Sequence, residues 1–194
     1  MKRVGLTGSI ATGKSTVSAY LKEKSIPIID ADLVAKEVMK DPKVIEQLVS
    51  TFGEEVKTET GELNRVALGG LIFGSKIGIQ LLNDIVQPTI RLAITQKMDE
   101  LATANVPLVV ADIPLLFEQK YESLFDEVIV VYTTPEQQLQ RLMKRNHLSQ
   151  LEAEKRIRSQ IAIDDKKELA TVVFDNTGDQ EKLYQQVEQW LLEN

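Results

Sequence analysis

The residues GSIATGKS at positions 8–15 fit the pattern G-x-x-x-x-G-K-[ST], and no other feature constrains the fold of this chain as strongly. A short apolar segment, residues 4–7, precedes the pattern, and Val17, Tyr20 and Leu21 follow it at the spacing of a helix. A strand, a glycine-containing loop and a helix in this order form a P-loop, in which backbone N–H groups and the helix N-terminus bind polyphosphate. The sequence therefore predicts that the chain binds a nucleoside triphosphate.

Two side chains of the pattern have expected chemical roles. In a P-loop the lysine reaches the β- and γ-phosphates, and the hydroxyl that follows it contacts Mg²⁺. We therefore expect Lys14 to act on the phosphates and Ser15 to be a magnesium ligand. The alternative is a glycine turn that merely precedes a lysine-bearing helix, and the strand before the turn argues against it.

The composition excludes several classes of functional site. The chain of 194 residues has no Cys and a single His, His147, which excludes disulfides, thiolate nucleophiles, histidine-rich metal sites and a serine triad. No apolar run approaches the ~20 residues that cross a bilayer. The chain also reaches its first predicted strand with no room for a signal peptide. We expect a cytoplasmic protein with no membrane partner.

Charge is distributed unevenly along the chain. The formal net charge of −6 argues against nucleic acid as a partner, because non-specific binding to nucleic acid needs a basic face. Residues 141–158, here called the cationic segment, carry six Lys or Arg residues against two Glu residues, a net charge of +4 that leaves the remainder at −10. Such a segment indicates a small anionic ligand, and a solvated helix face is the alternative for any single side chain.

Five short apolar, β-branched runs predict buried parallel strands. Helical patterns separate these runs, which is the alternating order of an α/β domain. The sequence thus predicts a three-layer α/β/α fold of the P-loop NTPase type with a parallel sheet. The expected strands are Arg3–Thr7, Ile26–Ile29, Pro107–Asp112, Glu127–Thr133 and Thr171–Phe174.

Helix-start signals occur before and within the cationic segment. Thr134 is expected to cap a helix that has Pro135 in its first position and Gln137 in the capping-box position. Ser149 and Glu152 predict a second capping box.

A long interval without strand signals, residues 33–105, lies between the second and third predicted strands. The pattern after Pro42 predicts an amphipathic helix, and residues 79–102 predict more helix, interrupted at Gln87 and Pro88. A simple crossover needs only about a dozen residues. We therefore expect a helical insertion at the carboxyl ends of the strands, where ligands bind in open α/β sheets.

Carboxylates follow two of the predicted strands. Asp30 and Asp32 end the second strand, on the side where the P-loop presents phosphate. A carboxylate there suits the general base of phosphoryl transfer to an alcohol, and alternatively one Asp caps the next helix. We expect Asp30 to be structural and Asp32 to be catalytic. Asp112 ends an apolar run in the manner of a Walker B strand and is a candidate magnesium ligand, although many strands end in Asp.

Arg141 and Arg145 lie four residues apart on one predicted helix face. Planar guanidinium groups can clamp phosphate oxygens and offset the charge of a transferred phosphoryl group. Helical kinase lids use arginines in this way and also exclude water. We therefore expect both arginines to be catalytic.

Taken together, these segments resemble the dephospho-CoA kinase family. The resemblance rests on GLTG and GKSTV at residues 5–8 and 13–17, on IDAD at 29–32 and on DIPLLFE at 112–118. It continues through QLQR at 138–141, RN at 145–146, RIRSQ at 156–160 and FDNTG at 174–178, and so spans nearly the whole chain. The P-loop alone is generic, whereas IDAD and DIPLLFE are much more specific to the family.

The resemblance implies transfer of the γ-phosphate of ATP to the ribose 3′-hydroxyl of dephospho-CoA, the last step of coenzyme A synthesis, with Mg²⁺. It implies that Asp32 is the base facing this hydroxyl and that Arg141 and Arg145 are lid cations. The acceptor site would comprise Asp32, Pro114, Leu115, Leu116 and Glu118. The ATP site would comprise Gly8, Ala11, Thr12, Gly13, Lys14, Ser15 and Thr16.

The expected organisation has three parts. Residues 1–33, 105–135 and 167–194 form the P-loop core, residues 34–104 form the helical substrate-binding insertion, and residues 136–166 form a cationic helical lid. A monomer or a small homo-oligomer is expected.

Two departures from the family pattern stand out. Ser9 and Ala11 replace glycines of many members, at variable positions of the loop, so phosphate binding should survive. Gln87 stands before Pro88 where many members have His, so a titrating imidazole cannot act there.

Two other functions remain open at this point. One is a different P-loop kinase with a nucleoside or nucleotide acceptor. The other is a nucleotide-binding switch, because Asp175–Gly178 matches D-x-x-G. That match comes late in the chain, and no guanine-reading Asn-Lys-x-Asp motif accompanies it.

Overall fold

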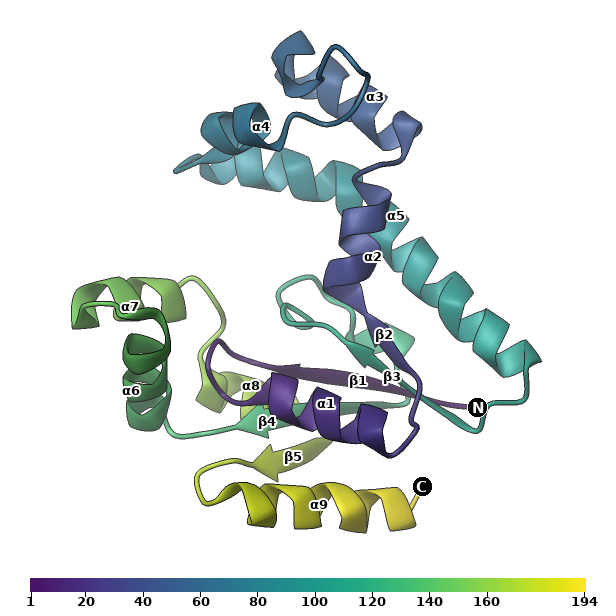
Figure 1. Ribbon diagram of the computed structural model, residues 1–194, viewed down its shortest axis with the longest axis vertical. Coiled ribbons are helices and arrows are strands. Elements are labelled where there is room, and N and C mark those ends of the chain that lie inside the picture. Colours follow the sequence, from purple (N-terminus) through teal and green to yellow (C-terminus); the bar gives the residue numbers. More distant parts are fainter. The chain divides into compact units, whose positions relative to one another are not determined.

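The computed structural model describes all residues, 1–194, and divides them into two compact units. The core unit comprises Met1–Asp30 and Met98–Asn194, and the helical unit comprises Ala31–Lys97. Figure 1 labels the elements of both.

The core unit is built on a five-stranded parallel sheet of order β2-β3-β1-β4-β5. The strand that leads into the P-loop, β1, is central, and every strand is short and apolar, as buried parallel strands are. All five strands lie within two residues of the predicted runs. Their bounds are β1 Lys2–Gly8, β2 Ile28–Asp30, β3 Leu108–Asp112, β4 Glu127–Tyr132 and β5 Val172–Asp175.

Helices α1 (Lys14–Glu23) and α9 (Gln180–Leu192) cover one face of this sheet. Their apolar side chains, such as Leu21 and Val187, pack in one core cluster with Val4 and Leu6 of β1. These contacts lie on one face because alternate residues of a strand point to the same side.

The opposite face of β1, marked by Gly5 and Thr7, is covered by the chain that follows β3 and by helix α8 (Ile163–Leu169). A Cβ added to Gly5 would lie 2.6 Å from Leu116. The Thr7 hydroxyl donates to the Pro114 carbonyl, which also accepts from Lys166 of α8. Helices thus lie on both faces of the sheet, which confirms the three-layer prediction.

The helical unit contains no strand. Its elements are α2 (Ala31–Val38), α3 (Pro42–Phe52), the 3₁₀ turn η1 (Glu54–Val56), α4 (Arg65–Ile72) and α5 (Lys76–Thr103), whose last residues belong to the core unit. Asp41 caps α3 by accepting from the Lys43 N–H. The predicted interruption at Gln87 and Pro88 was wrong, because α5 continues through Pro88 as one helix. A proline removes one helical N–H and clashes with the preceding turn, but the 12 helical residues before Pro88 and the 15 after it keep the remaining ladder intact.

The cationic segment lies in helices α6 (Pro135–Asn146) and α7 (Gln150–Ile157) and their connections. Thr134 caps α6 and the Ser149–Glu152 capping box opens α7, as predicted. Gln137 does not complete a capping box. Its side chain instead accepts from the Thr133 hydroxyl and donates to a carbonyl of the β5–α9 loop.

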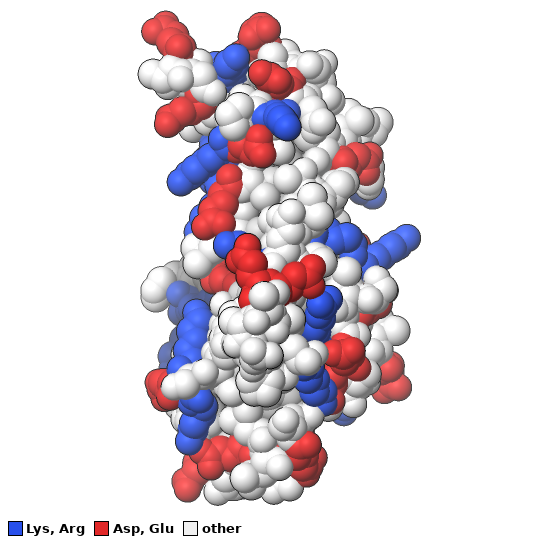
Figure 2. Space-filling model, turned by 90° about the vertical axis from the view of Figure 1, so that its right-hand side faces the viewer, with Lys and Arg blue, Asp and Glu red and all other residues white.

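Charged side chains of both signs are interspersed over the face drawn in Figure 2. None of the helices is long and apolar enough to pass through a lipid bilayer.

Gly5→Ala should lower the free energy of unfolding by about 1–3 kcal/mol, the usual cost of overpacking a core. The new methyl group would lie 2.6 Å from the fully buried Leu116 and 2.8 Å from the ring of Phe125. Urea unfolding followed by circular dichroism measures the loss.

Gly70→Ala is the control, since Gly70 lies in α4 and an added Cβ would meet no atom within 4 Å beyond the adjacent backbone of its own helix. It should raise stability by about 0.5–1 kcal/mol, because alanine favours a helix more than glycine does. Equal effects of the two substitutions would contradict the packing described for β1.

Candidate functional site

The loop between β1 and α1 has the backbone of a phosphate-binding loop. Ala11 and Gly13 have positive φ angles of 63° and 102°, which turn the chain sharply before the helix begins. A Cβ on Gly13 would overlap the side-chain amide of Asn176, so this glycine is needed for close approach as well as for its conformation. The helix N-terminus, the loop amides and the Lys14 ammonium together form an arrangement that can bind polyphosphate.

Lys14 forms an ion pair with Asp112 at the end of β3. Both side chains are largely buried. The sheet register places Asp112 beside Leu6 of β1 and beside Asp30 of β2. The structure therefore brings together the predicted phosphate lysine, the predicted metal ligand and the carboxylate expected to be structural.

Asp32 does not lie at the strand end, where the sequence placed it. The strand ends at Asp30, and Asp32 is an exposed residue of the first turn of α2, in the helical unit. The sequence pattern could not separate the two, because a strand end and a helix start follow one another without a loop residue between them.

Arg141 and Arg145 both lie on α6, but their surroundings differ. The Arg141 guanidinium donates to the Asn176 carbonyl at 2.9 Å and is partly buried. Arg145 is exposed and donates to Asn146. Asn176 also donates from its side chain to the Thr12 carbonyl at 2.8 Å, so Arg141 is linked to the P-loop through this residue.

The predicted acceptor segment after β3 is divided between core and surface. Leu116 is fully buried beneath β1, Leu115 is exposed, and Pro114 is half-buried. Glu118 turns toward α8, accepting from Lys166 and from the Ile161 N–H. One of its carboxylate oxygens, Oε2, is buried with no hydrogen-bond partner.

Lys166 is a buried cation that the sequence reasoning missed. Its side chain is 0% exposed, its ammonium pairs with Glu118 at 2.8 Å, and it donates to the Gly8 carbonyl at the start of the P-loop at 3.0 Å. Burial lowers the pKa of Lys166 below its ordinary value, which the hydrogen bond and charge of Glu118 oppose and the charge of Lys14 reinforces. A lysine three residues after the buried Ile163, on the same helix face, was the available signal.

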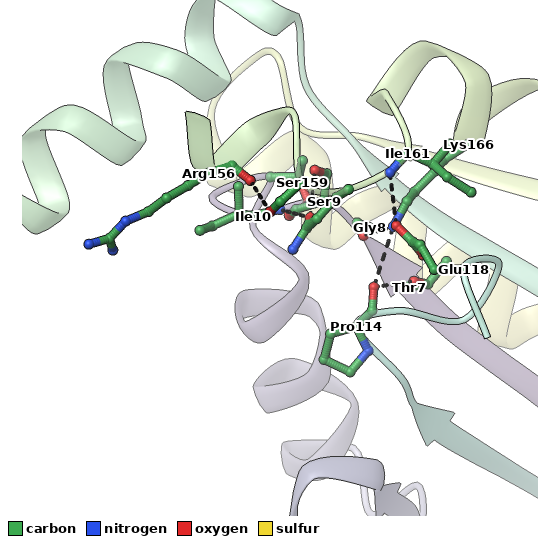
Figure 3. Close-up of polar contacts among 12 residues, drawn as sticks. Thr7, Gly8, Ser9, Ile10, Pro114, Glu118, Arg156, Ser159, Ile161 and Lys166 are labelled. Carbon is green, nitrogen blue, oxygen red and sulfur yellow. Dashed lines mark hydrogen bonds and ion pairs between the residues drawn. The ribbon is translucent and has the colours of Figure 1, made fainter. Parts of the chain in front are cut away.

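Two glutamines were also missed as functional candidates. Gln138 of α6 and Gln160, after α7, both bond to Ser9 and Ile10 of the P-loop. Gln138 is 1% exposed and lies four residues before the buried Leu142, so a polar residue at an apolar helical position marked it. Figure 3 shows how closely the segment around Ser159 approaches Ser9 and Ile10.

The residues predicted to bind magnesium offer a suitable donor set. Ser15 provides a hydroxyl in the first turn of α1, and Asp112 provides a carboxylate at the end of β3. Magnesium in phosphoryl-transfer sites takes one or two carboxylates and completes its shell with water and phosphate oxygens. These two oxygen donors therefore fit a magnesium ion that is bound together with a nucleotide.

A family model described as dephospho-CoA kinase matches residues 2–182. Among curated proteins, a dephospho-CoA kinase of Enterococcus faecalis is 47% identical over 99% of this chain and 96% of its own length.

Solved structures agree with this match. The dephospho-CoA kinase of Campylobacter jejuni superposes with a TM-score of 0.76 at 32% identity, covering 100% of this chain and 97% of the other. The protein TT1252 of Thermus thermophilus has a TM-score of 0.80 at 34% identity, covering 99% of this chain and 97% of the other.

The buried Lys166 should make stability depend on pH above neutrality. A lysine whose pKa falls on folding binds fewer protons folded than unfolded, between its lowered pKa and its ordinary value of 10.5. In that window the free energy of unfolding contributed by Lys166 rises with pH.

The reference protein is the double variant Lys166→Met/Glu118→Gln, which removes both titrating groups of the pair. Urea unfolding at a series of pH values between 7 and about 10 should show the unaltered chain gaining stability relative to this variant. A constant difference across the series would contradict the lowered pKa.

Proposed function

The chain belongs to the dephospho-CoA kinase family, and we propose that it transfers the γ-phosphate of ATP to the ribose 3′-hydroxyl of dephospho-CoA. Enzymes of this family are ATP-dependent kinases that act on a hydroxyl group. The reaction is the last step of coenzyme A synthesis.

The observation that carries this proposal is the family match over nearly the full chain, joined to a P-loop whose lysine lies at the carboxyl edge of a parallel sheet. In such sheets ligands bind outside the carboxyl ends of the strands. The ion pair of Lys14 and Asp112 places a cation and a carboxylate at that edge.

In the proposed reaction the 3′-oxygen bonds to the γ-phosphorus as the bond from that phosphorus to the β–γ bridging oxygen breaks, and ADP leaves. Lys14 would stabilise the charge on the phosphates. Asp32 would accept the proton of the 3′-hydroxyl or hold that hydroxyl in line, an assignment that rests on its position two residues after β2 and on the family pattern.

The remaining roles are proposed on the same basis. Arg141 and Arg145 would offset the charge of the transferred phosphoryl group from a helical lid, residues 136–166. The segment from Pro114 to Glu118 would line the acceptor cleft, and residues 34–104 would form the substrate-binding insertion. The ATP contacts would come from Gly8 and from Ala11 to Thr16.

Ser15 and Asp112 would hold Mg²⁺. When bound, the ion supplies charge neutralisation between the β- and γ-phosphates. We also propose a cytoplasmic location, no nucleic-acid partner, and a monomer or small homo-oligomer.

A different P-loop kinase with a nucleoside or nucleotide acceptor is the nearest alternative. An activity screen that offers dephospho-CoA and nucleosides in parallel separates the two. The nucleotide-binding switch has less support, because the Asp175 carboxylate of the D-x-x-G match accepts from the Thr177 N–H within its own turn.

Lys14→Ala should abolish transfer in a coupled assay with ATP, Mg²⁺ and dephospho-CoA, because it removes the charge directed at the β- and γ-phosphates. Circular dichroism should show an unchanged fold, since Lys14 makes no core contact in the apolar cluster. Unchanged turnover in the variant would defeat the P-loop assignment.

Asp32→Asn should lower kcat by about 10²–10⁴-fold, the usual contribution of a general base. Asparagine keeps the shape and much of the hydrogen bonding of Asp32, so the affinity for ATP should change little. Steady-state kinetics with dephospho-CoA and isothermal titration with ATP measure the two quantities.

Asp30→Asn is the matched control and should cost mainly stability. The reverse result, an inactive Asp30→Asn and an active Asp32→Asn, would assign the base to the carboxylate that lies beside Asp112 on the neighbouring strand.

A further inference from the structure

Two residues of the P-loop, Ser9 and Ile10, are held by side chains from outside the loop, in addition to the bonds that Thr12 donates to the Ser9 carbonyl within it. Gln160 Oε1 accepts from the Ser9 hydroxyl and from the Ile10 N–H, both at 2.9 Å. Gln138 Nε2 donates to the Ser9 hydroxyl oxygen and to the Ile10 carbonyl, both at 2.8 Å. The two glutamines thus bond to the same two residues in opposite roles, Gln160 as the acceptor and Gln138 as the donor.

The backbone of Ile10 fixes which end of each amide is used. A backbone N–H can only donate, so Gln160 must present its oxygen, and a backbone carbonyl can only accept, so Gln138 must present its nitrogen. Ser9 then accepts from one glutamine and donates to the other. Its hydroxyl completes a continuous chain of hydrogen bonds across the loop.

Both glutamines lie at the ends of the cationic segment. Gln138 is in α6, three residues before the segment begins, and Gln160 follows its last arginine by two residues. Everything between them, including most of α6 and all of α7, is attached to the P-loop at its two ends. Figure 3 shows the Arg156 side chain pointing away from the loop, while the chain at Ser159 lies against it.

The chain next to Gln160 is itself held by a buried ion pair. The N–H of the next residue, Ile161, donates to Glu118 at 3.0 Å, and Glu118 pairs with the fully buried Lys166. Lys166 in turn donates to the Gly8 carbonyl. Burying an ion pair rarely adds stability compared with apolar packing, so a positioning role accounts for this pair better than a stabilising one.

We propose that Gln138 and Gln160 are positioning residues that couple the cationic segment to the P-loop, so that its arginines reach the phosphates only when Ser9 and Ile10 are held. This inference rests on the proposed kinase function. In this proposal neither glutamine touches the reacting atoms. A misplaced segment would bring its cations to the wrong position and leave the phosphates open to water.

The test compares variants that keep or remove the hydrogen-bond acceptor of Gln160 or the hydrogen-bond donor of Gln138. Gln160→Glu keeps the acceptor oxygen that Gln160 uses, whereas Gln160→Met removes it at similar length. For Gln138 the donor matters, so Gln138→Glu should behave like Gln138→Met. Gln140→Met, an exposed glutamine of α6, is the control for substitution on this helix.

Two readouts are measured at saturating ATP: kcat for transfer to dephospho-CoA, and ATP hydrolysis relative to transfer. Gln160→Met should lower kcat by between about tenfold and a hundredfold, as a small misplacement of catalytic groups does. The ratio of hydrolysis to transfer should rise, with the thermal midpoint checked in parallel. Gln160→Glu should bring both kcat and the ratio of hydrolysis to transfer most of the way back to the values of the unaltered chain. Its added negative charge should act chiefly on the KM for ATP.

Ser9→Ala is the second variant, for use if a glutamine variant fails to fold. It breaks the chain of hydrogen bonds but leaves each glutamine bonded to Ile10, so a smaller change in the same direction is expected. The proposal is overturned if Gln160→Met stays within about twofold of the unaltered chain, or if Gln160→Met and Gln160→Glu are equally impaired.

Failure of the proposed function gives a different result. The unaltered chain would then transfer no phosphate to dephospho-CoA. The ATP hydrolysis of the variants relative to the unaltered chain would still test the coupling, with a rise in Gln160→Met but not in Gln160→Glu supporting it and equal rates overturning it.

Discussion

A loop that offers its backbone N–H groups to a ligand cannot use the same groups to hold itself in place. The P-loop of this chain meets that constraint mainly through its carbonyls, since among its N–H groups those of Ile10 and Thr12 are bonded within the protein, to Gln160 and to the Ser9 carbonyl. The oxygens of Gly8, Ile10 and Thr12 accept from the side chains of Lys166, Gln138 and Asn176 respectively. Side-chain donors from three later parts of the chain thus satisfy alternate carbonyls of the loop.

In the core unit the buried ion pair that supports the loop lies apart from the apolar cluster packed against α1 and α9. The apolar cluster lies between the sheet and the helices α1 and α9, and it contains no charged side chain. The buried charges of Lys166 and Glu118 lie with α8, on the other face of β1. Because a buried ion pair costs desolvation on both partners, apolar burial must supply the stability, both in the cluster and on this face, where Leu116 and Ile163 are buried.

Much of the fold was predictable because its signals are local. The five strands are continuous apolar runs, and the caps Thr134 and Ser149 act within one helical turn. Gln137 and Pro88 were misjudged because tertiary contacts or long flanking helices outweigh a local rule. Helix α4 was not predicted, because its signals in the sequence are weak: two glycines lie among its eight residues.

The site was predictable to the extent that it is a contiguous motif. Lys14 could be assigned from eight neighbouring residues, whereas its pairing with Asp112 spans 98 positions and follows from the strand order. The supports of the loop are separated from it by 128 to 164 positions, and glutamine and asparagine carry no charge signal that would mark them. The helical spacing of Gln138 with Leu142 is a weak signal in the sequence, and the burial that distinguishes Gln138 from the exposed Gln140 is visible only once the fold is known.

The cationic segment combines fixed ends with exposed charges. Its end attachments, Gln138 and Gln160, are neutral and bonded to the P-loop, whereas Lys144, Arg145 and Arg156 are exposed. Neutral anchors matter for nucleotide affinity, because a carboxylate in their place would attract these cations and raise the KM for ATP, and a further cation would repel them. Attachment through amides therefore fixes where the segment begins and ends while leaving its positive charge available to an anion bound at the loop.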